Sequence, residues 1–428
     1  MPSLVVSDES GRIYDHPFLK LSARSGHTFL KPEQEHLIPL PFGSQLFSMP
    51  GRIPLGWDKQ KKDFVACDSM VLSGKERRCF PVAAFPAPGY LRTLLPATIQ
   101  SKTSPPTLPL WAYTAVGWKD GKFWITALQI DPNPHWHPRY FQNDQRVARS
   151  VQAFLQKKPH NRLLQQLSRC ALEYHCFAAK NLFLKRWECP LPTSPVCNSR
   201  CLGCLSLQPG ECCPSSQERI QFVPTVDELI EVAVPHLGVK DGIVSFGQGC
   251  EGEPLLQAET LIQTIQQVRT KTRQGIINLN TNGSLPDRAE AIIRAGLDSI
   301  RVSLNSLNPT AYEHYYRPHG YAFEKVMETV KRAKKRGIYT SINLLIFPGI
   351  TDRQREFERL CRFIKDSRID LIQMRNLNID PDLYLERVRP EESEGELIPL
   401  WKIVEILKAS FPKLRMGYFN QPAGVIRG

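Results

Sequence analysis

The chain has 428 residues, more than one hydrophobic core usually supports, so we expect at least two domains. Its apolar fraction of 42% and charged fraction of 23% are ordinary for a globular protein and exclude wholesale disorder. No apolar run reaches the length of a membrane span, and the first residues lack the pattern of a secretory signal. We therefore expect no membrane partner and a cytoplasmic location.

The net charge of +13 is concentrated in the first part of the chain. Residues 1–190 carry 25 Lys and Arg against 14 Asp and Glu, and they hold six of the seven tryptophans. Cations interspersed with flat rings are typical of RNA binding, but a basic surface over an aromatic core explains the same residues. The charge suggests an anionic partner, which is RNA, a nucleotide or an acidic peptide.

Residues 1–180 are rich in proline and favour a separate, partly β domain at the N-terminus. Residues 111–130 have the pattern of a hairpin that turns at Asp120-Gly121. Residues 142–155 and 162–183 have helical periodicity and should connect this domain to the rest of the chain.

Short apolar runs alternate with helical stretches after residue 241, which is typical of βα units in a parallel sheet. Thr225 and Glu228 have the spacing of a capping box and predict a helix that runs to about residue 236. Further helices are expected after Pro254 and over 287–294, 323–336 and 352–365. Six strands are expected, at residues 184–187, 243–246, 276–280, 299–304, 339–347 and 371–374.

Three cysteines lie within eight residues of a loop that follows the proline-rich segment 187–195. Cys197, Cys201 and Cys204 have the spacing CxxxCxxC, which places three thiols close enough to bind one cubane iron-sulfur cluster. Zinc is the alternative metal, but a structural zinc site normally needs a fourth protein ligand, and only Cys212 and Cys213 are near in sequence. Three thiolates on a four-iron cluster leave one iron open, and that iron can chelate a small molecule.

The CxxxCxxC loop resembles that of the radical S-adenosylmethionine (SAM) superfamily, and the resemblance extends over residues 184–375. The segment Gly252-Glu253-Pro254 is similar to the glycine-glutamate motif of that family. The segments NLNTNGS and RVSLNSLNP look like stretches of its molybdenum-cofactor and activating-enzyme branches. The resemblance implies an α/β fold with a partial (βα)6 barrel over residues 181–380, after the basic domain 1–180 and before a helical extension, 381–428.

The resemblance also implies cofactors and the residues that bind them. A 4Fe-4S cluster is expected on Cys197, Cys201 and Cys204. SAM contacts are expected from the ends of the second, third and fourth strands, at Gly252, Glu253, Thr281, Asn282, Ser303 and Asn305. We also expect the segment LLIFPGITDRQREFE to lie near the ribose of SAM and Gln373-Met374-Arg375 to lie near its adenine.

Two positions depart from the family pattern. Gly203 stands where the family usually has an aromatic residue, so we expect Leu202 or Leu205 to cover that face of the adenine. The inserted segment 247–251 places Cys250 near the pocket, either as a substrate-handling thiol or as a small packing residue.

By this resemblance, the chain is a radical SAM enzyme that cleaves SAM to a 5'-deoxyadenosyl radical, which abstracts a hydrogen atom from the substrate. It would need an electron donor such as flavodoxin or ferredoxin, and no catalytic acid or base is assigned. One interpretation has RNA or a nucleotide as substrate, and a second has a peptide or protein, including a glycyl-radical partner. A third is a noncatalytic iron-sulfur or zinc protein that binds nucleic acid. The oligomeric state stays open.

Overall fold

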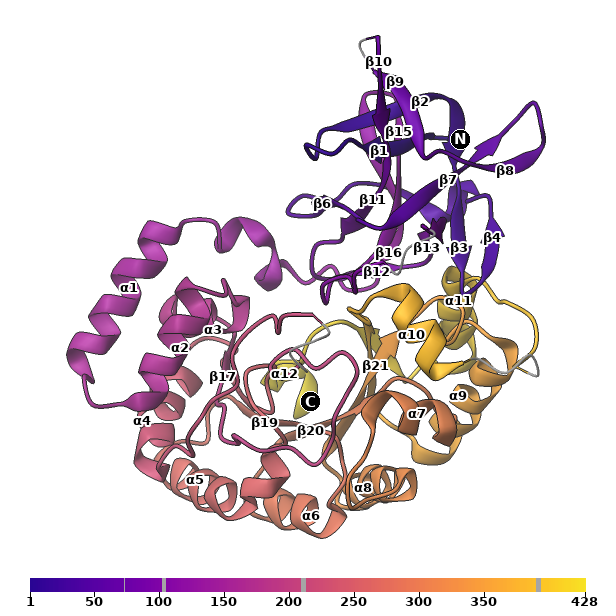
Figure 1. The fold of residues 1–428 in the computed structure, drawn as a ribbon. Coiled ribbons are helices and arrows are strands. Elements are labelled where there is room, and N and C mark those ends of the chain that lie inside the picture. The colour runs from indigo at the N-terminus through magenta and orange to yellow at the C-terminus, as the bar shows by residue number, and fades with distance from the viewer. Residues whose placement is uncertain (73, 102–104, 209–212, 390–393) are drawn as a thin grey trace.

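The computed structural model describes residues 1–72, 74–101, 105–208, 213–389 and 394–428. An antiparallel β part, drawn in indigo to purple in Figure 1, packs beside a curled parallel sheet with helices on its outer face. The expected α/β architecture, with a partial barrel after a β-rich N-terminal part, is confirmed.

The N-terminal part is built around a large antiparallel sheet. Its main path, in spatial order, is β12 (Tyr90–Arg92), β16 (Lys122–Gln129), β15 (Thr114–Lys119), β11 (Phe80–Phe85), β1 (Ser3–Ser7), β2 (Ile13–Leu21), β7 (Arg52–Asp58) and β14 (Thr98–Gln100). Side strands pair with this path at β5 (Leu37–Pro39), β6 (Gln45–Ser48) and β8 (Asp63–Ala66). Smaller pairings join β3 (Ala23–Ser25) to β4 (Thr28–Leu30) and β13 (Leu95–Pro96), and β9 (Ser69–Leu72) to β10 (Lys75–Arg78).

The expected hairpin is formed by β15 and β16, with Lys119 opposite Lys122. Asp120 and Gly121 both have positive φ, at 52° and 71°, which is the conformation that a two-residue hairpin turn requires. The turn therefore forms where the Asp-Gly pair predicts it.

Helices connect the two parts of the molecule. They are α1 (Asp144–Lys157), α2 (Arg162–Leu172) and α3 (Phe177–Phe183), preceded by the short 3-10 turns η2 (Pro134–Trp136) and η3 (Pro138–Tyr140). The expected helix over 162–183 is divided in two, because His175 adopts a left-handed backbone with φ of 49°.

The partial barrel is a parallel sheet in which strand order follows chain order. Its strands are β17 (Glu188–Pro190), β18 (Ile243–Phe246), β19 (Ile276–Thr281), β20 (Ser299–Leu304), β21 (Tyr339–Ile346), β22 (Leu371–Asn376) and β23 (Arg415–Gly417). Its outer helices are α4 (Val226–Leu237), α5 (Ala258–Lys271), α6 (Pro286–Arg294), α7 (Pro309–Tyr316), α8 (Phe323–Lys335) and α9 (Gln354–Ser367), with η4 (Pro254–Gln257) before α5.

Two of the expected elements of the barrel differ from those observed. The first strand is Glu188–Pro190 rather than 184–187, because Lys185 and Trp187 have positive φ and cannot continue a strand. The segment after residue 380 is not only helical: α10 (Pro381–Val388), α11 (Leu400–Ser410) and α12 (Ala423–Ile426) flank β23, which adds a further strand beside β22. Three residues, Arg-Met-Gly, carry no alternation from which a strand could be predicted.

The N-terminal part is fixed to the barrel by buried ion pairs. Arg52 donates to Asp380 at 2.7 Å and to Asp382 at 3.2 Å, and Arg24 pairs with Asp382 at 2.5 Å. These contacts join β3 and β7 to the start of α10. The two parts therefore share one continuous interface on the side of β22.

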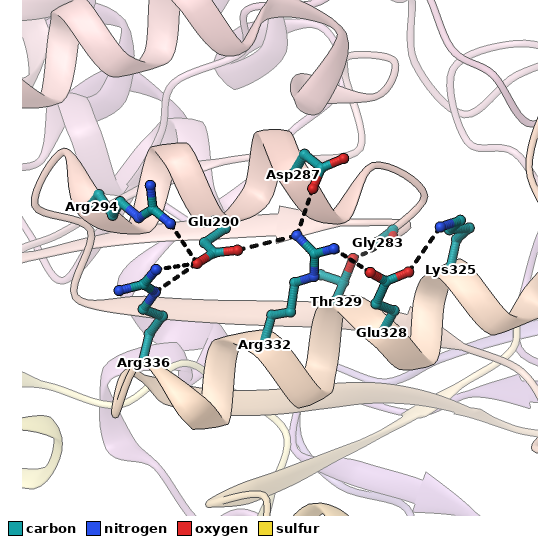
Figure 2. A network of polar contacts seen from close by, with 9 residues as sticks. All are labelled: Gly283, Asp287, Glu290, Arg294, Lys325, Glu328, Thr329, Arg332 and Arg336. Carbon is teal, nitrogen blue, oxygen red and sulfur yellow. Dashed lines mark hydrogen bonds and ion pairs between the residues drawn. The ribbon is translucent and has the colours of Figure 1, made fainter.

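A surface network ties α6 to α8 on the outside of the barrel (Figure 2). Arg332 donates to Asp287 at 2.5 Å and to Glu290 at 3.1 Å, and it also pairs with Glu328. Arg336 closes the network on the far oxygen of Glu290. Asp287 is exposed, whereas Arg332, Glu328 and Glu290 are partly buried, so the pairs of this network lie at the edge of the contact between the two helices.

Candidate cofactor and substrate site

The cysteine loop lies directly against the Gly252-Glu253 segment that follows β18. The amide of Gly252 donates to the Ser194 carbonyl at 2.7 Å, and that of Glu253 donates to the Val196 carbonyl at 2.9 Å. A Cβ at Gly252 would lie 1.9 Å from the Val196 carbonyl oxygen. Only glycine permits this approach, so Gly252 positions the loop through its lack of a side chain.

The structure brings Cys197, Cys201 and Cys204 together as half-buried thiols. Burial raises the pKa of Cys197 to about 11, and burial together with the charges of Cys204 and Cys197 raises the pKa of Cys201. In the parts of the chain described, no three His, Cys, Asp or Glu side chains converge on the position of a single metal ion. Three thiols that bind three different irons of one cubane need not converge on one point.

A buried arginine, which the sequence did not single out, lies beside this loop. The Arg219 guanidinium donates to the Cys204 sulfur at 3.4 Å and to the Ser206 hydroxyl at 3.2 Å. A cation at hydrogen-bond distance stabilises a thiolate. The donor set of three thiols with an adjacent guanidinium therefore fits an anionic iron-sulfur cluster.

Glu253 connects the cysteine loop to the carboxyl end of β19. Its carboxylate accepts hydrogen bonds from the Thr281 hydroxyl at 2.5 Å, the Asn282 amide at 2.8 Å and the Leu255 amide at 3.0 Å. Burial raises the pKa of Glu253 to about 7 in spite of these donors. A carboxylate so poorly solvated would be stabilised by a cation at this position.

Asn282 ties the end of β19 back to the cysteine loop. Its side-chain amide donates to Asn198 at 2.8 Å and to Ser199 at 3.0 Å. Four of the expected SAM contacts, Gly252, Glu253, Thr281 and Asn282, therefore form one connected group around the loop.

The two expected contacts on β20 have different surroundings. Ser303 lines the cavity described below. Asn305 is fully buried, and its side chain donates to the Ala311 carbonyl at 3.0 Å and to the Tyr384 hydroxyl at 3.1 Å. Asn305, the residue after β20, thus joins the end of that strand to α7 and α10.

The space beside Gly203 is taken by Tyr315 of α7. A Cβ at Gly203 would lie 3.0 Å from the Tyr315 hydroxyl oxygen. Of the residues expected there, Leu202 is buried in the hydrophobic core and Leu205 is part of the cavity wall. Tyr315 lies far along the chain, so no local motif could have indicated it.

A cavity of about 560 Å³ opens at the carboxyl ends of the strands. In barrels of parallel strands this is the end where ligands bind. The wall includes residues from the cysteine loop, from the ends of β18, β20, β21 and β22, and from the N-terminal part and α3; among them are Gly203, Gln248, Ser303, Asn343, Asn376, Trp136 and Phe177.

A buried polar network joins the inner faces of several strands at the cavity. Glu188 accepts hydrogen bonds from Ser245 at 2.5 Å, Gln248 at 3.0 Å and Asn420 at 2.7 Å, all on one carboxylate oxygen. Gln373 donates to the other end of Asn420 at 2.7 Å. Polar residues face the inside of the barrel, while the alternate apolar residues pack under the helices.

The segment after β21, expected near the ribose, contacts the N-terminal part. The Asp352 carboxylate accepts hydrogen bonds from the Ser25 hydroxyl and, at 2.6 Å, from the Gly349 amide. Of the three residues expected near the adenine, Arg375 lines the cavity, Met374 is buried and Gln373 belongs to the floor network.

Two further cysteines of interest, Cys250 and Cys213, are buried. Cys250 is buried, and its thiol is hydrogen-bonded to that of Cys170, which raises the pKa of Cys250. Cys213 is also buried, while Cys212 lies outside the described residues.

Two of the tryptophans, Trp136 and Trp187, are buried and stack on Phe419 and His135 respectively.

Comparison with known proteins places the barrel in a family. Residues 191–364 match the model of the Radical SAM superfamily. The chain is 31% identical to the probable GTP 3',8-cyclase of Aeropyrum pernix over 185 residues, which are 42% of this chain and 48% of that protein. It is 33% identical to the GTP 3',8-cyclase of Aquifex aeolicus over 181 residues, 41% of this chain and 52% of that protein. The chain thus spans about half the length of these relatives.

Solved structures are more distant. The maturase HydG of Carboxydothermus hydrogenoformans shares 14% identity, with 67% of this chain and 72% of that chain covered and a TM-score of 0.38. SuiB of Streptococcus suis, solved with SAM bound, shares 12% identity, with 60% and 57% covered and a TM-score of 0.36. We draw no argument from such scores.

In the described segments, none of the helices has the length and apolar character needed to cross a membrane.

The family model, the cysteine loop and the parallel partial barrel agree with one another. Residues 191–364 of the chain, which form most of the barrel, are a radical SAM domain, and enzymes with this domain use a 4Fe-4S cluster and SAM.

Proposed function

We propose that this protein cleaves SAM reductively and removes a hydrogen atom from a nucleotide held in the barrel cavity. The observation that carries the proposal is that the cysteine loop, the Glu253 group and the cavity adjoin at the carboxyl ends of the strands. The cluster and SAM, when bound, would supply the electron and the 5'-deoxyadenosyl radical that family chemistry uses.

The cluster would be held by Cys197, Cys201 and Cys204, with Arg219 stabilising the negative charge of the thiolates. Glu253 would bind the ammonium group of the methionine part of SAM. One carboxylate oxygen already accepts two hydrogen bonds, from Thr281 and Leu255, whereas the other accepts one and has room for another donor.

The wall of the cavity suits chemistry that must exclude water. Trp136 stacks on Phe419 with ring centroids 5.0 Å apart, and Tyr418 lies beside them. These rings come from η2, in the connecting segment, and from the segment after β23, so both segments contribute aromatic surface to the wall of the cavity. Such a wall would protect a radical from stray donors.

A nucleotide is proposed as the substrate on three grounds. The curated relatives named above are GTP 3',8-cyclases. The cavity volume falls within the range of small-molecule sites. The front half of the chain is basic, as expected of a protein that attracts an anion.

The test is anaerobic reconstitution of the full chain with iron and sulfide, followed by assay with SAM and a low-potential donor such as dithionite or flavodoxin. We expect four irons per chain, formation of 5'-deoxyadenosine, and faster formation when GTP is added. Cys201→Ala should remove both iron and activity, while Cys361→Ala, on the outer helix α9, should remove neither.

A fully loaded cluster that yields no 5'-deoxyadenosine would refute the enzymatic proposal. Product formed at the same rate with and without GTP, and no change in the mass of GTP, would refute the nucleotide part alone.

A further inference from the structure

Two arginines face the barrel cavity from strands on either side of β21. Arg301 lies on β20 and Arg375 lies on β22, and both are part of the cavity wall. Burial lowers the pKa of Arg301, the charge of Arg375 lowers it further, and the charge of Glu188 raises it. The cavity therefore has two cationic groups on one side.

Neither guanidinium forms an ion pair within the described part of the chain. Arg301 donates to the Gln373 side chain at 2.7 Å, and its buried Nε has no hydrogen-bond partner there. Arg375 donates to the Tyr418 carbonyl at 3.0 Å and lies over the Tyr418 ring, 5.0 Å from its centroid. Both cations are thus held by neutral groups.

One carboxylate, that of Glu188, also lies in the cavity wall and offsets part of the charge of this pair. Glu188 accepts three hydrogen bonds on one oxygen, from Ser245, Gln248 and Asn420, and forms no ion pair with either arginine among the described contacts. The wall holds two cationic side chains, Arg301 and Arg375, and one carboxylate, Glu188, so its charged groups carry a net positive charge.

Other buried arginines of this chain show how unusual this arrangement is. Arg24 and Arg52, which lie at the interface of the two parts, are paired with Asp380 and Asp382. Arg92 is buried without an acid, but it donates to two backbone carbonyls and does not line the cavity. Arg301 and Arg375 differ from all of these because both border a space large enough for a ligand.

Burying a cation without a counter-charge costs free energy, and a bound anion would offset that cost. A guanidinium has five N–H donors in a planar fork that matches the oxygens of a phosphate group. We infer that Arg301 and Arg375 bind a phosphate group of the substrate within the barrel. This inference rests on the proposed function and names the part of the nucleotide that enters the cavity.

The carboxylate of SAM is the competing source of an anion. Ser303, an expected SAM contact, lies two residues after Arg301 on the same strand and faces the same cavity. A test must therefore measure SAM and nucleotide separately.

The experiment uses the reconstituted full chain and its variants Arg301→Gln and Arg375→Gln, with Arg362→Gln as the control on the exposed face of α9. Equilibrium dialysis measures binding of labelled GTP, guanosine, pyrophosphate and SAM. Both cavity variants should bind GTP and pyrophosphate about ten- to a hundredfold more weakly, the loss expected for hydrogen bonds to a charged group. Guanosine and SAM should bind as they do to the wild type, and Arg301→Lys should restore part of the affinity for GTP.

Three results would overturn the inference: a wild type that binds neither GTP nor pyrophosphate, cavity variants that bind GTP as well as the control does, or variants that lose SAM in place of GTP. Iron content and thermal unfolding show whether each variant folds. If Arg301→Gln does not fold, the less buried Arg375→Gln decides the question. Dialysis requires no turnover, so absence of 5'-deoxyadenosine would refute the proposed function without affecting these binding results.

Discussion

Arg52 offers the sharpest test of how the N-terminal part is fixed over the barrel. Its side chain is only 2% exposed, it pairs with Asp380 and Asp382, and it also donates to the Pro106 carbonyl at 2.7 Å. Replacing it by Met keeps most of the volume but leaves the Asp380 carboxylate buried without its counter-charge. Burial already raises the pKa of Asp380, and the Arg52 guanidinium is the main influence that lowers it.

Removing one partner of a buried ion pair typically costs about 3 to 5 kcal/mol. We therefore expect Arg52→Met to destabilise the full chain by an amount of that order. Denaturant unfolding followed by circular dichroism and by tryptophan fluorescence measures the change. The two probes also report whether the N-terminal part, whose strands and loops up to residue 129 hold four of the seven tryptophans, now unfolds before the barrel.

The control is Arg77→Met, which removes an arginine whose side chain is 48% exposed and lies 3.8 Å from Asp8. Arg77 is half-exposed, and Asp8, although buried, keeps hydrogen bonds from Ser10 and Tyr14, so losing this pair should cost less than about 1 kcal/mol. The double variant Arg52→Met with Asp380→Asn should recover part of the loss, because it removes the unpaired charge. If Arg52→Met costs no more than the control, the ion pairs do not hold the interface and our reasoning fails.

Three further outcomes are expected. Cys213→Ala should leave the iron content of the reconstituted protein unchanged, and loss of iron would add Cys213 to the cluster ligands. Gly252→Ala should impair cluster assembly, because its Cβ would lie 1.9 Å from the Val196 carbonyl oxygen, whereas Gly424→Ala has open space and should assemble normally. Burial raises the pKa of Asp352 from 3.8 to about 6, so the folded state binds the proton more tightly and stability falls as pH rises through that window. Asp352→Asn should remove this fall and gain up to about 3 kcal/mol above pH 6 in denaturant unfolding; an unchanged pH profile would contradict the assignment.

Local patterns in the sequence predict the βα units, the capping box at Thr225 and the hairpin at Asp120-Gly121, and the structure confirms these elements. Such features depend on neighbouring residues, because periodicity, turn conformation and capping act over a few positions. The cysteine spacing is local in the same way. The first strand lies later than predicted, because left-handed residues interrupt the predicted range. The strand β23 was not predicted, because three residues leave no periodic signal.

The sequence by itself therefore determined the family, the barrel and the loop that would hold the cluster. Only the tertiary structure decided what surrounds that loop: Arg219 on a cysteine sulfur, Tyr315 beside Gly203, and Asn305 turned toward α7. It also brought Arg301 and Arg375 to one cavity from strands that are far apart in sequence. The physical reason is that burial, unpaired charge and close packing are properties of residues distant in the chain, which no local pattern encodes.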